Sequence, residues 1–227
     1  MIIAKIIGGL GNQMFQYAAG FCLAHLNNTQ LKLDLSGFEE YGLRNFDLKS
    51  FNIHYEVATD EEIMELRPSR NLEKVLQYLS PREKRTYYRE KYFHFDEKIF
   101  LLGSNIYLKG YFQSEKYFHP AKDMLRQEFN FKEAVISNVR EFSRKLLTSN
   151  SVSVHIRHGD MKKDSASRDY HGVLSIDYYK KSIAIIQSKI RHPTFYFFSD
   201  DINWVKENLS FPDAVYVSDN ITKNHLE

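Results

Sequence analysis

The chain opens with MIIAKIIGGLGNQMFQYAAGFCLAHLNNTQLKLDL (Met1–Leu35), which contains three elements in a row. Met1–Ile7 is apolar and β-branched and predicts a buried strand, and the glycine-rich Gly8–Gly11 predicts a tight turn. Apolar side chains then recur at helical spacing over Met14–Leu26, and Leu31–Leu35 alternates apolar and polar residues as a second strand does. This β-α-β unit is typical of an open parallel α/β sheet.

The second half of the chain repeats this alternation. The expected strands are Ser151–Arg157, Thr194–Phe198 and Ala214–Val217, and the expected helices are Asp177–Ile190 and Ile202–Leu209. This order implies a parallel sheet with right-handed crossovers. The polar stretch Thr148–Ser151 predicts the domain boundary, so residues 1–150 and 151–227 are expected to form two Rossmann-like α/β domains.

Further elements are expected between these two blocks. Thr59 and Glu62 have the spacing of a capping box, ahead of a short helix that must end near Pro68. The remaining apolar patterns predict a strand at Ile106–Phe112 and helices at Asn71–Leu79, Glu115–Phe129 and Val139–Leu147.

Composition places the chain among folded globular proteins. It has 227 residues, with 31 basic and 29 acidic side chains and 43% hydrophobic residues, enough for a substantial core. The net charge of +2 argues against bulk electrostatic binding of nucleic acid. No apolar run approaches the ~20 residues of a membrane-spanning helix, whereas peripheral contact with a membrane surface stays open. The lone Cys22 predicts a buried structural thiol, and with no secretory signal near Met1 it points to a cytoplasmic protein.

The stretch Pro81–Phe95 mixes basic and aromatic side chains. It has two interpretations, a grip on an anionic polymer or a solvated face, and the second is favoured because Glu83 and Glu90 interrupt the positive charge. Its aromatic residues either stack on sugars or pack into a core, and core packing is expected.

The glycine-rich turn at Gly8–Gln13 lies between a strand and a helix, where backbone N–H groups and the helix dipole favour an anion. It lacks the Gly-Lys-Ser/Thr ending of a P-loop. The spacing of Gly9 and Gly11, with Asp34 at the end of the next strand, fits a dinucleotide fingerprint better, although Met14 stands where a third glycine or alanine belongs. A plain tight turn is the simplest interpretation.

Polar residues also follow the strand of the second half, at His155–Asp160. Ligands of open α/β sheets bind outside the carboxyl ends of strands, and the planar, charged fork of Arg157 suits a phosphate or pyrophosphate. His155 lies on the same strand face as Arg157. A structural salt bridge is the alternative role for Arg157. A metal site made by His155, His158, Asp160 and His171 is disfavoured because it has neither a helical HExxH motif nor cysteine ligands.

The triplet Ser199–Asp201 follows the next strand. One of its two acids, Asp200 or Asp201, is expected to cap the helix that begins at Ile202. The other is then left to accept hydrogen bonds from a ribose or a base.

Four motifs, in order over nearly the whole chain, resemble those of bacterial α-1,2-fucosyltransferases, glycosyltransferase family 11. They are GGLGNQMFQYAAG at Gly8–Gly20, LKGYFQSEKYF at Leu108–Phe118, SVSVHIRHGDM at Ser151–Met161 and FFSDDINWVKENL at Phe197–Leu209. The resemblance implies a GT-B-like α/β arrangement of two Rossmann-like domains, in which the second binds GDP-fucose and the first mainly meets the acceptor.

The resemblance also implies roles for individual residues. The family's His-x-Arg-Arg-Gly-Asp motif falls on His155–Asp160, with His158 in place of the second arginine and Met161 in place of the usual tyrosine. The first arginine falls on Arg157, which becomes the expected catalytic residue and contact to the donor's phosphates. The expected donor-binding residues are His155, Gly159, Asp160, Ser199 and Asp200, and those expected to face the cleft are Gly9, Gly11, Asn12 and Gln13.

The implied reaction transfers L-fucose from GDP-fucose to the 2-hydroxyl of a galactose-containing glycan, with inversion. Breaking the donor bond builds negative charge on the β-phosphate, which Arg157 can stabilise electrostatically, so no metal ion is required. A carboxylate is expected to take the proton of the attacking hydroxyl. Asp160 and Asp200 are expected to contact the donor instead.

Family members continue beyond the position of Asp219 with a further motif rich in Asn, Ser, Phe and Trp. The second domain is therefore expected to be truncated at its C-terminus, and this chain to bind GDP-fucose weakly and to transfer little fucose. Two other hypotheses stay open. One is an NAD-dependent Rossmann oxidoreductase, based on Gly9, Gly11 and Asp34, and the other is a non-catalytic carbohydrate-binding or assembly subunit.

Overall fold

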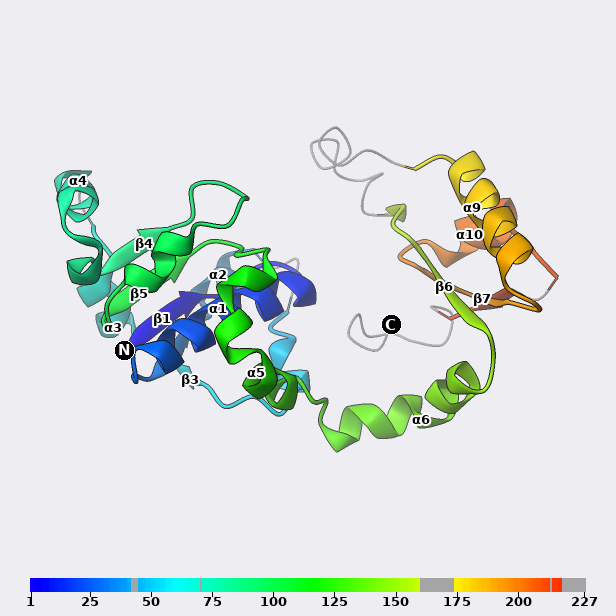
Figure 1. The fold of residues 1–227 in the computed structure, drawn as a ribbon, viewed down its shortest axis with the longest axis horizontal. Coiled ribbons are helices and arrows are strands. Elements are labelled where there is room, and N and C mark those ends of the chain that lie inside the picture. The colour runs from blue at the N-terminus through cyan, green and yellow to red at the C-terminus, as the bar shows by residue number, and fades with distance from the viewer. Residues whose placement is uncertain (42–44, 70, 160–173, 213, 218–227) are drawn as a thin grey trace. The chain divides into compact units, whose positions relative to one another are not determined.

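The structure is a computed structural model that describes residues 1–41, 45–69, 71–159, 174–212 and 214–217 (Figure 1). The chain forms two compact units, Met1–Lys132 and Glu133–Glu227. Helix α6 (Glu133–Leu147) therefore belongs to the second unit, where Phe142 packs edge-on against Tyr196 at 5.6 Å between ring centroids. The boundary thus lies before α6 and not near Asn150.

The first unit contains a five-stranded parallel sheet with the strand order β3-β2-β1-β5-β4. Its strands are β1 (Ile2–Lys5), β2 (Leu31–Asp34), β3 (Glu56–Val57), β4 (Tyr87–Arg89) and β5 (Ile106–Lys109). From β1 the chain adds β2 and β3 on one side of β1, and it later adds β4 and β5 on the other side. The direction of strand addition therefore reverses between β1 and β5. Ligands of open α/β sheets bind at such a switch point.

Helices cover both faces of this sheet. Helix α1 (Leu10–Leu26) buries its apolar side, including Cys22, against Ala4 and Leu33, as the helical spacing predicted. On the other face, Leu66 of α3 (Asp60–Leu66) packs with Ile3 and Tyr107. The smaller elements are α2 (Ser36–Tyr41), α4 (Asn71–Leu79) and single 3-10 turns at Leu48–Ser50, Arg82–Lys84 and Glu97–Leu101.

The sequence located α3 correctly and the region after β5 less well. Thr59 and Glu62 form the expected capping box, each side chain accepting a hydrogen bond from the other's backbone N–H. The continuous helix expected over Glu115–Phe129 is wrong. Pro120 cannot donate a helical hydrogen bond, and the segment divides into two 3-10 turns, Glu115–Tyr117 and His119–Ala121, followed by α5 (Lys122–Glu128).

The second unit contains a parallel sheet with the order β6-β7-β8. Its strands are β6 (Ser151–Ile156), β7 (Thr194–Ser199) and β8 (Ala214–Tyr216), and its other helices are α9 (Ile176–Lys189) and α10 (Ile202–Asn208). Two right-handed crossovers in the same direction put α9 and α10 on one face of the sheet (Figure 1), where Ile183 and Val205 share a core with Phe197. Within the described ranges, no helix is long and apolar enough to cross a membrane.

Candidate functional site

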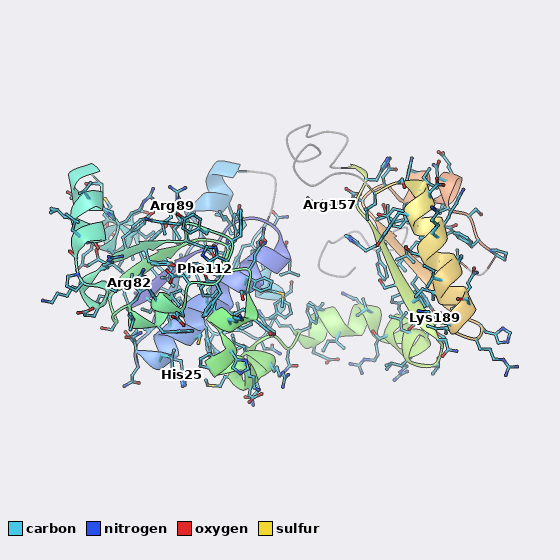
Figure 2. The ribbon with its side chains drawn as sticks, turned by 45° about the horizontal axis from the view of Figure 1, so that its top comes forward. His25, Arg82, Arg89, Phe112, Arg157 and Lys189 are labelled. Atoms are coloured by element: carbon cyan, nitrogen blue, oxygen red, sulfur yellow. The ribbon has the colours of Figure 1, made fainter. Side chains whose placement is uncertain are left out.

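In the second unit, the expected site residues lie in two adjacent loops at the carboxyl ends of β6 and β7. Pairing of Ile156 with Ser199 brings the two strand ends side by side. Arg157 is exposed and follows β6 directly (Figure 2). His155 is also exposed and lies opposite Phe198, on the face away from α9 and α10. This is the edge of an α/β sheet at which ligands bind.

Asp200 connects these two loops. Its Oδ1 atom accepts hydrogen bonds from the backbone N–H of His158 at 2.8 Å and from that of Gly159 at 2.9 Å. A Cβ atom on residue 159 would lie only 3.0 Å from the backbone oxygen of Asp200, so glycine permits this close approach. Asp200, which was expected to contact the donor, thus fixes the backbone that carries Arg157 through its Oδ1 atom.

His158 is a structural histidine at this edge. It is buried, its ring stacks on Trp204 at 3.8 Å between centroids, and its Nδ1 lies 3.1 Å from Oδ2 of Asp201. Asp201 is the acid that caps α10, because its Oδ1 accepts from the backbone N–H of Trp204. Its own N–H donates to Oγ of Ser199, a buried side chain. Ser199 and Asp201 thus form a hydrogen-bonded connection between the end of β7, the start of α10 and the ring of His158.

The structure brings His155, Arg157 and Gly159 together at this edge, with Ser199 and Asp200 supporting them. Asp160 and His171 lie outside the described residues. Among the residues that are described, no group of three His, Cys, Asp or Glu side chains is placed to hold a metal ion.

In the first unit, the glycine-rich loop connects β1 to α1. Gly9 is the N-cap of α1, which has no side-chain cap and no acidic residue in its first turn. A Cβ atom on Gly9 or Gly11 would meet nothing within 4 Å, whereas Gly8 has a φ of +83°, a conformation that favours glycine. The first turn of α1 therefore borders open space at Gly9 and Gly11.

Two of the four sequence motifs meet at this loop. The Nε2 atom of Gln113 donates a hydrogen bond of 2.7 Å to Oδ1 of Asn12. Asn12 follows β1 and Gln113 follows β5, so the pair lies at the switch point of the sheet. Sequence reasoning assigned no role to Gln113. Its position directly after the predicted strand Ile106–Phe112, within the motif Leu108–Phe118, was the signal that would have found it.

Gln13 corrects the expectation that the whole loop faces a cleft. Its side chain is fully buried, and Nε2 donates to the backbone oxygens of Gly8 and Asn45, both at 2.8 Å. Its Oε1 accepts from the N–H groups of Asp47 at 2.9 Å and Leu48 at 3.3 Å. Both donors and both acceptor positions of the amide are thus used inside the protein, so Gln13 has none for a ligand.

We expect Gln13→Met to lower the free energy of unfolding by about 3 kcal/mol, because a side chain of similar length leaves several buried backbone groups without partners. Urea denaturation followed by circular dichroism measures this change. Gln113→Ala, at an exposed amide, is the matched control and is expected to change stability by less than about 0.5 kcal/mol. Equal effects for the two variants would contradict a structural role for Gln13.

Asp34 does not serve as a ribose-binding acid. It is 1% exposed, and its carboxylate accepts hydrogen bonds from the backbone N–H of Ser36 and the hydroxyl of Tyr107. Burial favours the protonated form, but these hydrogen bonds and the charge of Lys5 outweigh it and lower the pKa of Asp34. A carboxylate enclosed in this way cannot meet a cofactor, which contradicts the oxidoreductase hypothesis.

Comparisons with known proteins bear on the whole chain. The model of glycosyl transferase family 11 matches residues 1–223. An alpha-1,2-colitosyltransferase of Escherichia coli is 34% identical over 91% of this chain and 71% of its own. The O-antigen biosynthesis glycosyltransferase WbnK of Escherichia coli is 32% identical over 94% of this chain and 77% of its own. A galactoside alpha-(1,2)-fucosyltransferase 2 of Rattus norvegicus is 24% identical, and the match covers 97% of this chain and 58% of the rat protein.

Among solved structures, NodZ alpha-1,6-fucosyltransferase co-crystallised with GDP matches with a TM-score of 0.54 at 14% identity. The match covers 95% of this chain and 77% of that one. At this identity the likeness shows a shared α/β fold alone. The resemblance that rested on four motifs is confirmed by the family model.

Proposed function

This chain belongs to glycosyl transferase family 11, and on that premise we propose that it transfers L-fucose from GDP-fucose to the 2-hydroxyl of a galactoside. Support comes from relatives that carry the names of α-1,2-linking enzymes, including fucosyltransferases. The observation that carries the proposal is the loop at the carboxyl ends of β6 and β7, where Arg157 is exposed and Asp200 fixes the backbone beside it.

The proposed reaction breaks the bond between the anomeric carbon of fucose and the β-phosphate oxygen. The electron pair of that bond stays with GDP, and the sugar becomes oxocarbenium-like. Arg157 stabilises the charge that develops on the phosphate, and a fixed guanidinium needs no metal ion beside it for this task. Because the loop is already held by Asp200, little reorganisation accompanies the reaction.

The acceptor's 2-hydroxyl attacks from the opposite face of the sugar and loses its proton to a base. Attack from that side converts a β-linked donor into an α-linked product, which makes the reaction inverting. The first unit, with its open loop at Gly9–Asn12, is the proposed acceptor side.

Colitosyl transfer is the second candidate for this site. The observation that favours it is identity, which is 34% to the Escherichia coli alpha-1,2-colitosyltransferase and 24% to the rat fucosyltransferase. Both candidates share the α-1,2 linkage and differ in the sugar that is transferred.

A transfer assay tests the proposal. The protein is incubated with GDP-fucose or with a nucleotide-activated colitose, together with galactosides such as lactose, and the product linkage is determined by NMR. We expect an α-1,2-linked fucosyl product. A colitosyl product alone would favour the second candidate, and a β-linked product would contradict inversion. Binding of the acceptor with no transfer from either donor would favour a non-catalytic carbohydrate-binding subunit.

A further inference from the structure

Three cations end three adjacent strands of the first-unit sheet. Arg89 of β4 pairs with Lys109 of β5, and the pairing of Ala4 with Leu108 places Lys5 of β1 beside Lys109 on its other side. By the alternation of strands, all three point to the face that is covered by α3. We call Lys5, Lys109 and Arg89 the cation row.

The cation row is destabilising as it stands, because like charges side by side in neighbouring strands repel one another. Arg67, the C-cap of α3, adds a fourth charge. The pKa of Lys109 is lowered, first by burial and then by the charges of Lys5, Arg67 and Arg89. The opposing effect of Asp34 is the smallest of these influences.

No acid forms an ion pair with the row within the described part of the chain, and the charge of Asp34 offsets the row only in part. The side chains of Lys5, Arg67, Arg89 and Lys109 form no hydrogen bond and no ion pair with the described residues. Asp34, the neighbour of Lys5 on β2, already accepts from Ser36 and Tyr107. The fold thus holds four positive charges close together, and none of these side chains has an ion-pair partner among the described residues.

Two members of the row, Arg89 and Lys109, line a cavity of about 1110 Å³ together with Arg67. This volume slightly exceeds the range of about 300–1,000 Å³ that is usual for small-molecule sites, so there is room for more than one sugar ring. Two of the acids in the lining are already engaged. Oε2 of Glu90 accepts from the N–H groups of Tyr111 and Phe112, while its buried Oε1 has no hydrogen-bond partner among the described residues, and Asp96 pairs with Arg82.

The same cavity carries an aromatic surface. The rings of Tyr92 and His94 stack at 5.2 Å with only 12° between their planes, and both residues are exposed. Tyr87, in the lining as well, stacks on the buried Tyr107. Flat aromatic faces beside a cationic row suit a ligand with apolar ring faces and an anionic group.

We propose that Arg67 and the two members of the cation row that line the cavity, Arg89 and Lys109, bind an oxyanion, a phosphate or a carboxylate, carried by the saccharide acceptor, with the acceptor's rings along the aromatic side of the cavity. This inference rests on the proposed function, because it names the class of acceptor. In this proposal the basic and aromatic stretch around β4 recognises an anionic saccharide and is more than a solvated face.

The test compares galactose 1-phosphate, galacturonate and galactose as ligands of the purified protein, followed by NMR shifts of the protein or by calorimetry. We expect at least one of the two anionic sugars to bind about tenfold more tightly than galactose, and the tighter one identifies the oxyanion as phosphate or carboxylate. Equal affinity for all three sugars would overturn the proposal. So would inorganic phosphate binding as tightly as galactose 1-phosphate, because the sugar would then contribute nothing.

Variants locate the effect. Lys109→Gln and Arg89→Gln are each expected to weaken binding of the preferred anionic sugar about tenfold and to leave binding of galactose unchanged. The matched controls, Lys122→Gln and Arg126→Gln, change exposed cations of α5 and are expected to have no effect. If the controls weaken binding as much as the row variants, the cation row is not the site.

Two further measurements, of GDP binding and of stability in urea, separate this inference from the proposed function. Binding of GDP is expected to stay at the wild-type level in Lys109→Gln and Arg89→Gln, so failure of the donor proposal leaves this test interpretable. The urea midpoint of Lys109→Gln is expected to rise, because a repelling charge is removed. A fall in that midpoint would contradict an uncompensated row.

Discussion

Replacing Arg157 with alanine is expected to lower fucosyl transfer about a thousandfold. Removal of one preorganised group that stabilises developing charge costs about 10²–10³ in turnover, and Arg157 carries a full charge. Its fork also allows two hydrogen bonds to neighbouring phosphate oxygens, which a smaller side chain cannot replace. Initial rates of GDP release with a galactoside acceptor measure the loss.

Two companion variants make this result specific. Arg157→Lys retains the charge and loses the planar fork, so transfer is expected to recover to about a tenth of wild type. Arg191→Ala removes another exposed arginine of the same unit and is expected to have no effect on rate. Unchanged transfer in Arg157→Ala would remove Arg157 from the reaction, and the alternative role of a structural salt bridge would then be preferred.

Replacing Asp200 with alanine is expected to lower transfer about a hundredfold, because Asp200 fixes the loop that carries Arg157. The substitution leaves the N–H groups of His158 and Gly159 without their acceptor, so the loop that carries Arg157 loses its fixed position. A displacement of about 1 Å at a reacting group is enough for a loss of this size. Asp200 is thus a positioning residue in this proposal.

Rescue by asparagine separates positioning from a charge effect. The carbonyl oxygen of Asp200→Asn can accept the same two hydrogen bonds, so this variant is expected to retain most of the activity. Asp177→Ala, at an exposed acid in the first turn of α9, is the control and is expected to be neutral. If asparagine fails as badly as alanine, the negative charge of Asp200 matters and the positioning account is wrong.

Local patterns were sufficient for much of the fold. The spacing of apolar residues predicted β1, α1 and β2, and the alternation after Asn150 predicted β6, α9, β7, α10 and β8, whereas α6 begins at Glu133, earlier than the predicted Val139. Errors arose where a single residue or a distant contact overrides the pattern. Pro120 divides the helix expected after β5, and packing of Phe142 on Tyr196 brings α6 into the second unit.

The sequence predicted that the candidate site residues follow strands, and the structure places them at the carboxyl ends of β6 and β7. Hydrogen-bond partners that lie far apart in the chain could not be predicted from the sequence. Gln13 is hydrogen-bonded to the backbone of Asn45 and Asp47, and Asp200 accepts a hydrogen bond from the backbone of His158 in the neighbouring loop. The cation row depends on the register between strands that are distant in sequence, so the sequence pattern around β4 showed only an interrupted run of charge.

Calorimetric titration with GDP tests the central claim most directly, because it needs neither an acceptor nor turnover. If the carboxyl ends of β6 and β7 hold the donor's diphosphate through Arg157, the wild-type protein gives a saturable binding isotherm and Arg157→Ala gives none at the same concentrations. The urea midpoints of the two proteins are expected to agree, which excludes unfolding as the cause. Equal binding of GDP by both proteins would contradict the assignment of the donor site.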